Sequence, residues 1–190
     1  MELSERFDQA LLYASRIHRA QCRKGGAIPY ISHLLAVAAL VLENGGSEAE
    51  AIAALLHDAV EDQGGLARLA EIEQLFGAAV AEIVAGCSDS WTDPKPAWEE
   101  RKRYYLERLP QASPGTLLVS SADKLHNMRT ILADYQEVGE ALWSRFSRGK
   151  PGILRYYRAL QLEYQRLGAP RRIVTELDRI LSALEDLAGR

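Results

Sequence analysis

The segment AALLHDAVED, residues 53–62, begins as a typical buried helix and ends in ionisable side chains. These ionisable residues are His57, Asp58, Glu61 and Asp62. Burying carboxylates and an imidazole beside leucines is costly unless an opposite charge compensates them. The segment therefore constrains the fold: a cation, most simply a divalent metal ion, is expected where this helix ends.

The rest of the chain has the pattern of successive amphipathic helices. Phe7, Ala10, Ala14 and Ile17 recur at steps of three and four, which predicts a helix over residues 4–20. Further helices are expected at 31–43, 47–61, 66–75, 77–87, 98–109, 113–133, 139–146, 151–167 and 170–187. No period-two strand pattern is convincing. The sequence predicts an all-α fold of about eight to ten helices, forming a single compact domain over residues 1–190.

Residue types at the expected helix ends support these boundaries. Ser47 followed by Glu50 is a capping box, so a helix is expected to begin there. The NGG triplet at 44–46 is a strong stop signal for the helix before it. Pro114 suits the first turn of the helix that follows 113.

Composition excludes several classes of protein. The 23 basic residues do not outnumber the 26 acidic ones, which argues against nucleic acid as a partner. Cys22 and Cys87 form no CxxC pair, so a zinc–thiolate site is not expected. No apolar window approaches the roughly 20 residues of a membrane span, and the N-terminus lacks the pattern of a signal peptide. We expect a cytoplasmic protein with no membrane partner.

Three separate predicted helices each carry a residue type that binds metals. His33 lies in the second helix, the pair His57-Asp58 near the end of the third, and Asp123 in a later apolar helix. A lone buried histidine is more often a hydrogen-bonded core residue than a ligand. The adjacent pair changes this balance, because neighbours on a helix point about 100° apart and can share one ion lying between them. Glu61 lies one turn beyond His57, on the same face.

Three longer motifs strengthen this interpretation. They are HRAQCRKGGAIPYISHLLAVA at 18–38, HDAVED at 57–62 and ADKLHNMRT at 122–130. Together they resemble the HD superfamily of metal-dependent phosphohydrolases, and within it the RelA/SpoT hydrolase branch. The resemblance covers roughly residues 5–165, with C-terminal helices at 151–187 expected to pack on this core. The chain is similar to the small stand-alone alarmone hydrolases, of the kind represented by the metazoan SpoT homologue.

The resemblance implies a metal site and a reaction. His33, His57, Asp58 and Asp123 would be the metal ligands, and Glu61 and Asp62 the catalytic carboxylates. The metal would be Mn²⁺, although two imidazoles and two carboxylates also suit Zn²⁺ or Fe²⁺. The implied activity is that of a (p)ppGpp 3′-pyrophosphohydrolase, which converts guanosine 3′,5′-bis(diphosphate) into GDP and pyrophosphate.

The resemblance also indicates which residues hold the nucleotide substrate. Arg23 and Lys24 precede a Gly-Gly turn, where a guanidinium offers planar contacts to a base or a phosphate. The remaining candidates are Asn127, Thr130, Arg145 and Tyr156. Asn127 lies one helical turn beyond Asp123 and so shares its face.

Two alternatives stay open at the level of sequence. The first is an HD phosphatase or pyrophosphohydrolase acting on another nucleotide, such as NADPH or an adenine alarmone. The second is a non-catalytic nucleotide-binding HD module. Residues 141–157, and a loop before Tyr30 that is one residue longer than in the long enzymes, depart from the RelA/SpoT pattern. The choice between ppGpp and pppGpp, the regulation and a homo-oligomeric state are left open.

Overall fold

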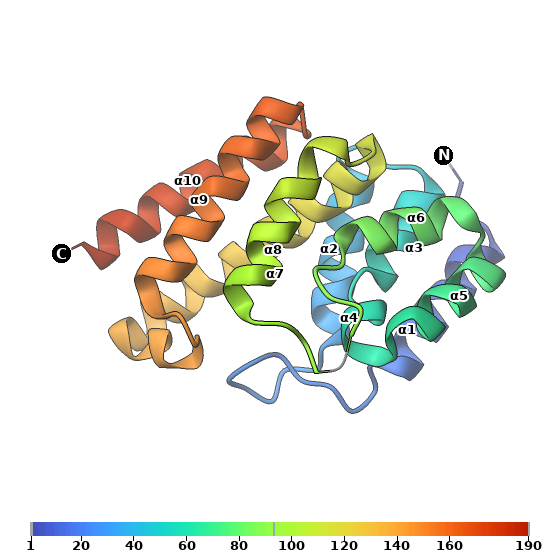
Figure 1. Cartoon of the computed structure of the whole chain (residues 1–190), viewed down its shortest axis with the longest axis horizontal. Helices are drawn as coiled ribbons and strands as arrows, with labels where there is room; N and C mark the ends of the chain where they lie inside the picture. Colours follow the sequence, from blue (N-terminus) through green and yellow to red (C-terminus); the bar gives the residue numbers. More distant parts are fainter. Residues whose placement is uncertain (1, 93, 190) are drawn as a thin grey trace. The chain divides into compact units, whose positions relative to one another are not determined.

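The computed structural model of the chain describes residues 2–92 and 94–189, and within them it confirms an all-α fold (Figure 1). These residues form ten α-helices and two short 3₁₀ helices, without a strand. The helices are α1 (Glu5–Ile17), α2 (Ile31–Glu43), α3 (Glu48–Leu56), α4 (Ala59–Gln63), α5 (Gly65–Phe76), α6 (Ala78–Cys87), α7 (Trp98–Arg108), η1 (Leu109–Gln111), α8 (Pro114–Val138), η2 (Gly139–Arg145), α9 (Gly149–Leu167) and α10 (Arg171–Ala188).

Two compact units make up the chain, Met1–Ser120 and Ser121–Arg190. The boundary falls inside α8, so the first two turns of this helix belong to the first unit. A single domain over the whole chain, with the C-terminal helices packed on the core, stays a prediction. None of the helices formed by the described residues is both long enough and apolar enough to cross a membrane.

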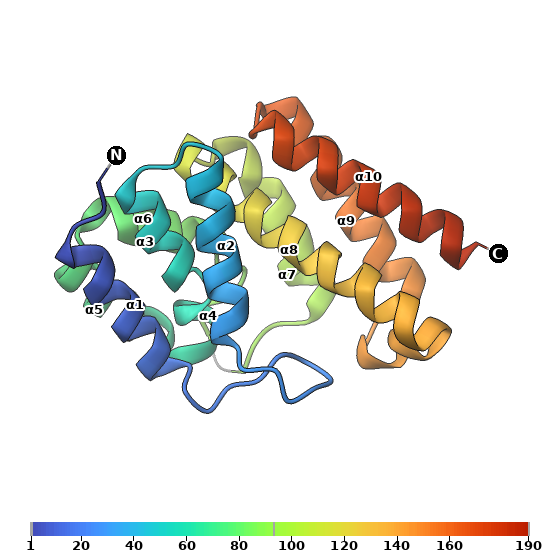
Figure 2. The same ribbon diagram turned by 180° about the vertical axis from the view of Figure 1, so that it is seen from behind.

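The first unit is built around the pair α2 and α3, which lie side by side in both views (Figures 1 and 2). Leu34 and Val41 of α2 and Ile52 and Leu55 of α3 are fully buried. Helices α1 and α6 pack against α3, so α3 is enclosed by neighbours. This enclosure explains why α3 is apolar around most of its surface.

The expected helix 47–61 begins as predicted but does not run unbroken. The Ser47 hydroxyl accepts the Glu50 N–H, and Glu50 Oε2 accepts the Ser47 N–H at 2.6 Å, so the capping box is confirmed. Helix α3 then ends at Leu56, and α4 begins at Ala59. Asp58 has φ −94° and ψ −4°, outside the regular helical range, which interrupts the helix between them.

The second unit contains the end of α8, the 3₁₀ helix η2 and the pair α9 and α10. Gly168 ends α9 in the left-handed conformation, and α10 returns alongside it after a short connection (Figure 2). Where a helix is expected at 139–146, the structure has the 3₁₀ helix η2 over Gly139–Arg145. Helix α8 extends to Val138, beyond the expected end at 133.

Candidate active site

Two histidines and an aspartate of the first unit converge at the break between α3 and α4. One ligand atom from each of His33, His57 and Asp58 lies within 4.8 Å of the others. His33 is in the first turn of α2, while His57 ends α3 and Asp58 precedes α4. Both imidazoles are at least 98% buried, whereas the Asp58 side chain is 20% exposed. The interruption of the helix therefore brings the adjacent His-Asp pair toward the start of α2.

The arrangement of ring nitrogens fits a bound cation. His57 Nδ1 lies 2.8 Å from the Ala54 carbonyl oxygen, to which it donates its proton. The neutral ring then carries a lone pair on Nε2, the form in which histidine binds metals. Nε2 lies 3.1 Å from Asp58 Oδ2, and His33 Nε2 lies 3.5 Å from the same oxygen. Two nitrogens and a carboxylate oxygen at this spacing form a donor set suited to a divalent transition metal.

Tyr30 links this cluster to the loop at 18–30. Its hydroxyl donates to Asp58 Oδ2 at 2.6 Å and so orients the carboxylate. The Tyr30 ring stacks on His18, with centroids 5.3 Å apart, and the Arg23 guanidinium lies 5.5 Å from the ring centre. Burial lowers the pKa of His18, which favours the neutral ring in this stack. Tyr30 therefore connects Arg23 to Asp58, because it contacts both residues. Lys24 is exposed on the same loop.

Glu61 and Asp62 lie in a charged network instead of on a solvated helix end. Lys95 Nζ lies 3.2 Å from Glu61 Oε1 and 3.1 Å from Asp62 Oδ1. Arg101 lies 3.4 Å from Glu61, and Gln21 Nε2 donates to Asp62 Oδ2 at 2.9 Å. Burial raises the pKa of Glu61, and the negative charges of Asp89 and Asp58 raise it further.

A cavity of about 550 Å³ opens beside these two carboxylates. Glu61, Asp62 and Lys95 line it, together with Gly65 and Trp91. Gly65 has φ +59°, and a Cβ at this position would lie 2.9 Å from the Trp91 carbonyl oxygen. Only glycine fits this approach without strain, so Gly65 allows the backbone of Trp91 to lie against the start of α5.

Asp89 is a buried anion held by two cations of α7. Its side chain is 3% exposed, Arg101 contacts Oδ1, and Lys102 Nζ lies 2.5 Å from Oδ2. Burial alone would raise the pKa of Asp89, but Lys102 and Arg101 hold it below its usual value. Since Arg101 also contacts Glu61, this group fixes the loop, α7 and the carboxylate of α4 together.

Replacing Asp89 with asparagine should cost about 3 kcal/mol of unfolding free energy at pH 7, because it leaves two half-buried cations without their anion. The pKa of Asp89 is lower folded than unfolded, so its contribution is fully present above the unfolded value of about 3.9. It is lost as the pH falls through the lower folded value. Urea unfolding of both proteins between pH 3 and 7 measures this. A pH-independent difference would contradict the assignment.

Three of the predicted site residues, Asp123, Asn127 and Thr130, lie on the part of α8 that belongs to the second unit. Asp123 is 5% exposed, and its carboxylate accepts hydrogen bonds from Asn127 Nδ2 and Lys124 Nζ, each at 2.5 Å. The structure thus brings Asp123 and Asn127 together, as their spacing predicts. The Thr130 hydroxyl donates to the His126 carbonyl oxygen at 3.1 Å.

Arg145 and Tyr156 are also in the second unit, in η2 and α9. The Arg145 guanidinium lies 2.7 Å from Asp134 Oδ2, and Tyr156 is 7% exposed. Their roles, like that of Asp123, stay predictions.

Three functional candidates were not predicted from the sequence. Tyr30 was only part of a motif, Lys95 lies in a segment whose prolines predict a plain loop, and Arg101 is one of three basic residues in ERKR at 100–103. A local signal existed for Tyr30 alone, since it precedes the helix of His33. Lys95 and Arg101 reach Glu61 from 34 and 40 positions along the chain, a distance that no local pattern spans.

Comparisons with known proteins agree on one family. Residues 10–153 match the family model of the HD domain. The guanosine-3′,5′-bis(diphosphate) 3′-pyrophosphohydrolase MESH1 of Homo sapiens is 42% identical over 126 residues, 65% of this chain and 68% of that protein. The bifunctional (p)ppGpp synthase/hydrolase SpoT of Escherichia coli strain K12 is 39% identical over 131 residues, 67% of this chain but 18% of SpoT.

A solved structure gives the same result for the fold. It is that of a metazoan ortholog of SpoT, described as hydrolysing ppGpp and playing a role in starvation responses. It aligns with a TM-score of 0.78 over 96% of this chain and 97% of its own, at 26% sequence identity.

Proposed function

The chain belongs to the HD domain family, as its motifs predict, and from this we propose that it hydrolyses guanosine 3′,5′-bis(diphosphate) to GDP and pyrophosphate. The observation that carries the proposal is the convergence of His33, His57 and Asp58 one helical turn before the half-buried carboxylate of Glu61 and that of Asp62. Relatives and a solved structure named for ppGpp hydrolysis support the substrate.

HD domains use a divalent metal, and a His-His-Asp site is present in the first unit. We propose Asp123 as the fourth ligand and Mn²⁺ as the metal. When bound, the cation would supply Lewis acidity to a phosphate oxygen and to water. A cytoplasmic location, a nucleotide as the small-molecule partner and the absence of nucleic acid as a partner belong to the same proposal.

Glu61 is the residue best placed to accept a proton from the attacking water. Its raised pKa makes it a stronger base than an ordinary glutamate, and the positive charges of Lys95 and Lys102 oppose part of that rise. Asp62, held by Gln21, would assist the transfer toward the leaving group. Lys95 lowers the repulsion between these carboxylates and the phosphates of an approaching substrate.

Product analysis tests the proposal directly. Purified protein is stripped of metal and incubated with ppGpp and Mn²⁺, Zn²⁺ or Mg²⁺, and the products are separated by ion exchange. We expect GDP and pyrophosphate with Mn²⁺. Turnover of NADPH or an adenine alarmone without turnover of ppGpp would replace the substrate and keep the reaction class. If no nucleotide is turned over, the proposal of an enzyme is wrong and the chain is a non-catalytic nucleotide-binding module.

Replacing Arg23 with alanine should raise KM for ppGpp about tenfold and leave kcat within a factor of about two, since a contact shared by ground and transition states affects binding alone. The guanidinium already lies over the Tyr30 ring, ready to stack on a base or meet a phosphate. Steady-state kinetics measure the two constants separately. Arg19→Ala, an exposed change on the same loop, is the control and should leave both unchanged. A defect confined to kcat would contradict this role.

A further inference from the structure

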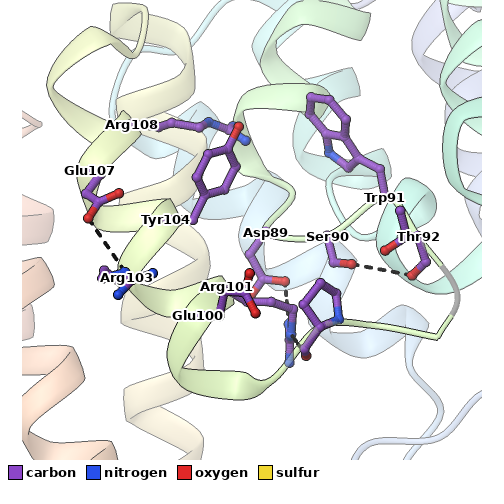
Figure 3. Close-up of a pocket in the computed structure, with 11 residues that line it drawn as sticks. Asp89, Ser90, Trp91, Thr92, Glu100, Arg101, Arg103, Tyr104, Glu107 and Arg108 are labelled. Atoms are coloured by element: carbon purple, nitrogen blue, oxygen red, sulfur yellow. Dashed lines mark hydrogen bonds and ion pairs between the residues drawn. The ribbon is translucent and has the colours of Figure 1, made fainter.

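A second cavity of about 350 Å³ lies in the first unit, between residues 89–92 and Pro96 on one side and α7 on the other (Figure 3). Asp89, Ser90, Trp91 and Thr92 line it from the loop, and residues of α7 line the opposite side. His33, His57, Asp58 and Glu61 are not among its lining residues. The cavity is large enough for a small ligand. It is therefore a candidate site distinct from the metal cluster, and it shares Trp91 and Thr92 with the cavity beside Glu61 and Asp62.

The exposed aromatic side chains gather at this cavity. Among the described residues, Trp91 and Tyr104 are the only aromatic side chains of the exposed class, 38% and 51% accessible respectively. Both line the same cavity, and Figure 3 shows their rings on its two sides. Large apolar rings left in water at one place mark a binding site more often than chance exposure does.

A guanidinium lies between the two rings. The Arg108 Cζ is 5.5 Å from the Trp91 ring centre and 5.0 Å from that of Tyr104. Its one hydrogen bond is to the Ala85 carbonyl oxygen at 3.3 Å. Within residues 2–92 and 94–189, no carboxylate forms an ion pair with Arg108. The site thus offers a half-buried positive charge framed by aromatic rings.

The other charges of the cavity are already compensated or distant. Arg101 contacts Asp89, and Arg103 lies 3.7 Å from Glu107 in an exposed pair. Glu100 is two helical turns before Arg108, or about 12 Å along α7. The position that lacks a counter-ion is therefore the one beside the rings. An occupant should carry a planar ring and an anionic group next to it.

We propose that this cavity binds a nucleotide, with the base stacked on Trp91 or Tyr104 and a phosphate paired with Arg108. Aromatic stacking is worth about 1–3 kcal/mol per base in nucleic-acid sites, and a guanidinium binds phosphate through charge-assisted hydrogen bonds. The inference goes beyond the proposed hydrolysis, because it needs neither the metal nor turnover.

Binding of GMP to the metal-free, full-length protein tests the site, measured by isothermal titration calorimetry. The titration is repeated with guanosine, which lacks the phosphate, and with inorganic phosphate, which lacks the ring. We expect GMP to bind at least about tenfold more tightly than either, since stacking and pairing each contribute. The affinities of AMP and UMP, compared with that of GMP, show whether the cavity distinguishes between bases. Equal affinity for inorganic phosphate and GMP would overturn the stacking.

Four variants locate the binding. Arg108→Gln and Tyr104→Leu should each weaken GMP binding about tenfold, and Trp91→Leu should do the same. Tyr104→Phe keeps the ring and should bind as the wild type does. Each measurement is repeated with Arg23→Ala, which removes the nucleotide contact proposed for the hydrolytic site. If Arg23→Ala weakens GMP binding and Arg108→Gln leaves it unchanged, the cavity is not a nucleotide site, whether or not the protein hydrolyses ppGpp.

Discussion

Replacing Asp58 with asparagine is expected to remove both the bound divalent metal and the hydrolysis of ppGpp. Asp58 Oδ2 is the atom on which His57 Nε2 and His33 Nε2 converge, at 3.1 and 3.5 Å. Asparagine keeps the volume and a carbonyl oxygen for the Tyr30 hydroxyl, but loses the negative charge that attracts the cation. Since Lewis-acid stabilisation is worth several kcal/mol, kcat/KM should fall about a thousandfold or more.

Elemental analysis of the purified variant measures the metal, and ppGpp turnover with added Mn²⁺ measures the activity. Circular dichroism verifies that the helices persist. Asp186→Asn, an exposed change in α10, makes the same chemical substitution and should retain both metal and activity. A variant that loses activity while holding its full metal content would show that Asp58 acts on the substrate, not on the metal.

Replacing Glu61 with glutamine should produce the opposite pattern: metal retained and hydrolysis lost. Loss of a positioned general base typically costs a factor of about 10² to 10⁴ in rate. Glutamine has nearly the same shape and can still accept hydrogen bonds from Lys95 and Arg101, so the network should hold. The change is therefore expected in kcat, with KM for ppGpp nearly unchanged.

Single-turnover kinetics of the Mn²⁺-loaded variant separate the chemical step from product release. Glu82→Gln, on the exposed face of α6, serves as the control and should leave the rate unchanged. If Glu61→Gln loses its metal together with its activity, Glu61 is a ligand, and the division of roles between Asp58 and Glu61 is wrong.

Much of the fold follows from local signals. Steps of three and four between apolar residues predict the helices, and Ser47 with Glu50 predicts where α3 begins. The break at His57 and Asp58 could not be predicted, because no glycine or proline marks it. It coincides with a contact between Tyr30 and Asp58, which are 28 positions apart in the chain. The decision between a continuous and an interrupted helix is thus made by tertiary structure.

The candidate site also contains some residues that the local sequence predicts and others that only tertiary structure brings together. The ligand types in HDAVED are visible because His57, Asp58, Glu61 and Asp62 are neighbours in sequence. Their partners are not, since Lys95 and Arg101 approach through the packing of a loop and of α7. Two prolines and several short polar residues in the segment around Lys95 predict only a loop there. The carboxylates of Glu61 and Asp62 are less buried than the sequence suggests, and their charge is compensated in part by protein cations, in addition to the proposed metal.

The interrupted helix also bears on how relatives of this chain can diverge. Each residue added to a helix turns every later side chain by about 100° and advances it by 1.5 Å. One residue inserted between Ala59 and Glu61 in α4 would therefore point Glu61 away from Lys95 and Arg101 while leaving His57 in place. Substitutions at Ala59 or Val60 keep this spacing, although both side chains are buried and Val60 also lines the cavity beside the carboxylates. Over evolutionary time the segment should therefore keep its length even where its sequence varies, so an insertion there in a relative would indicate lost activity.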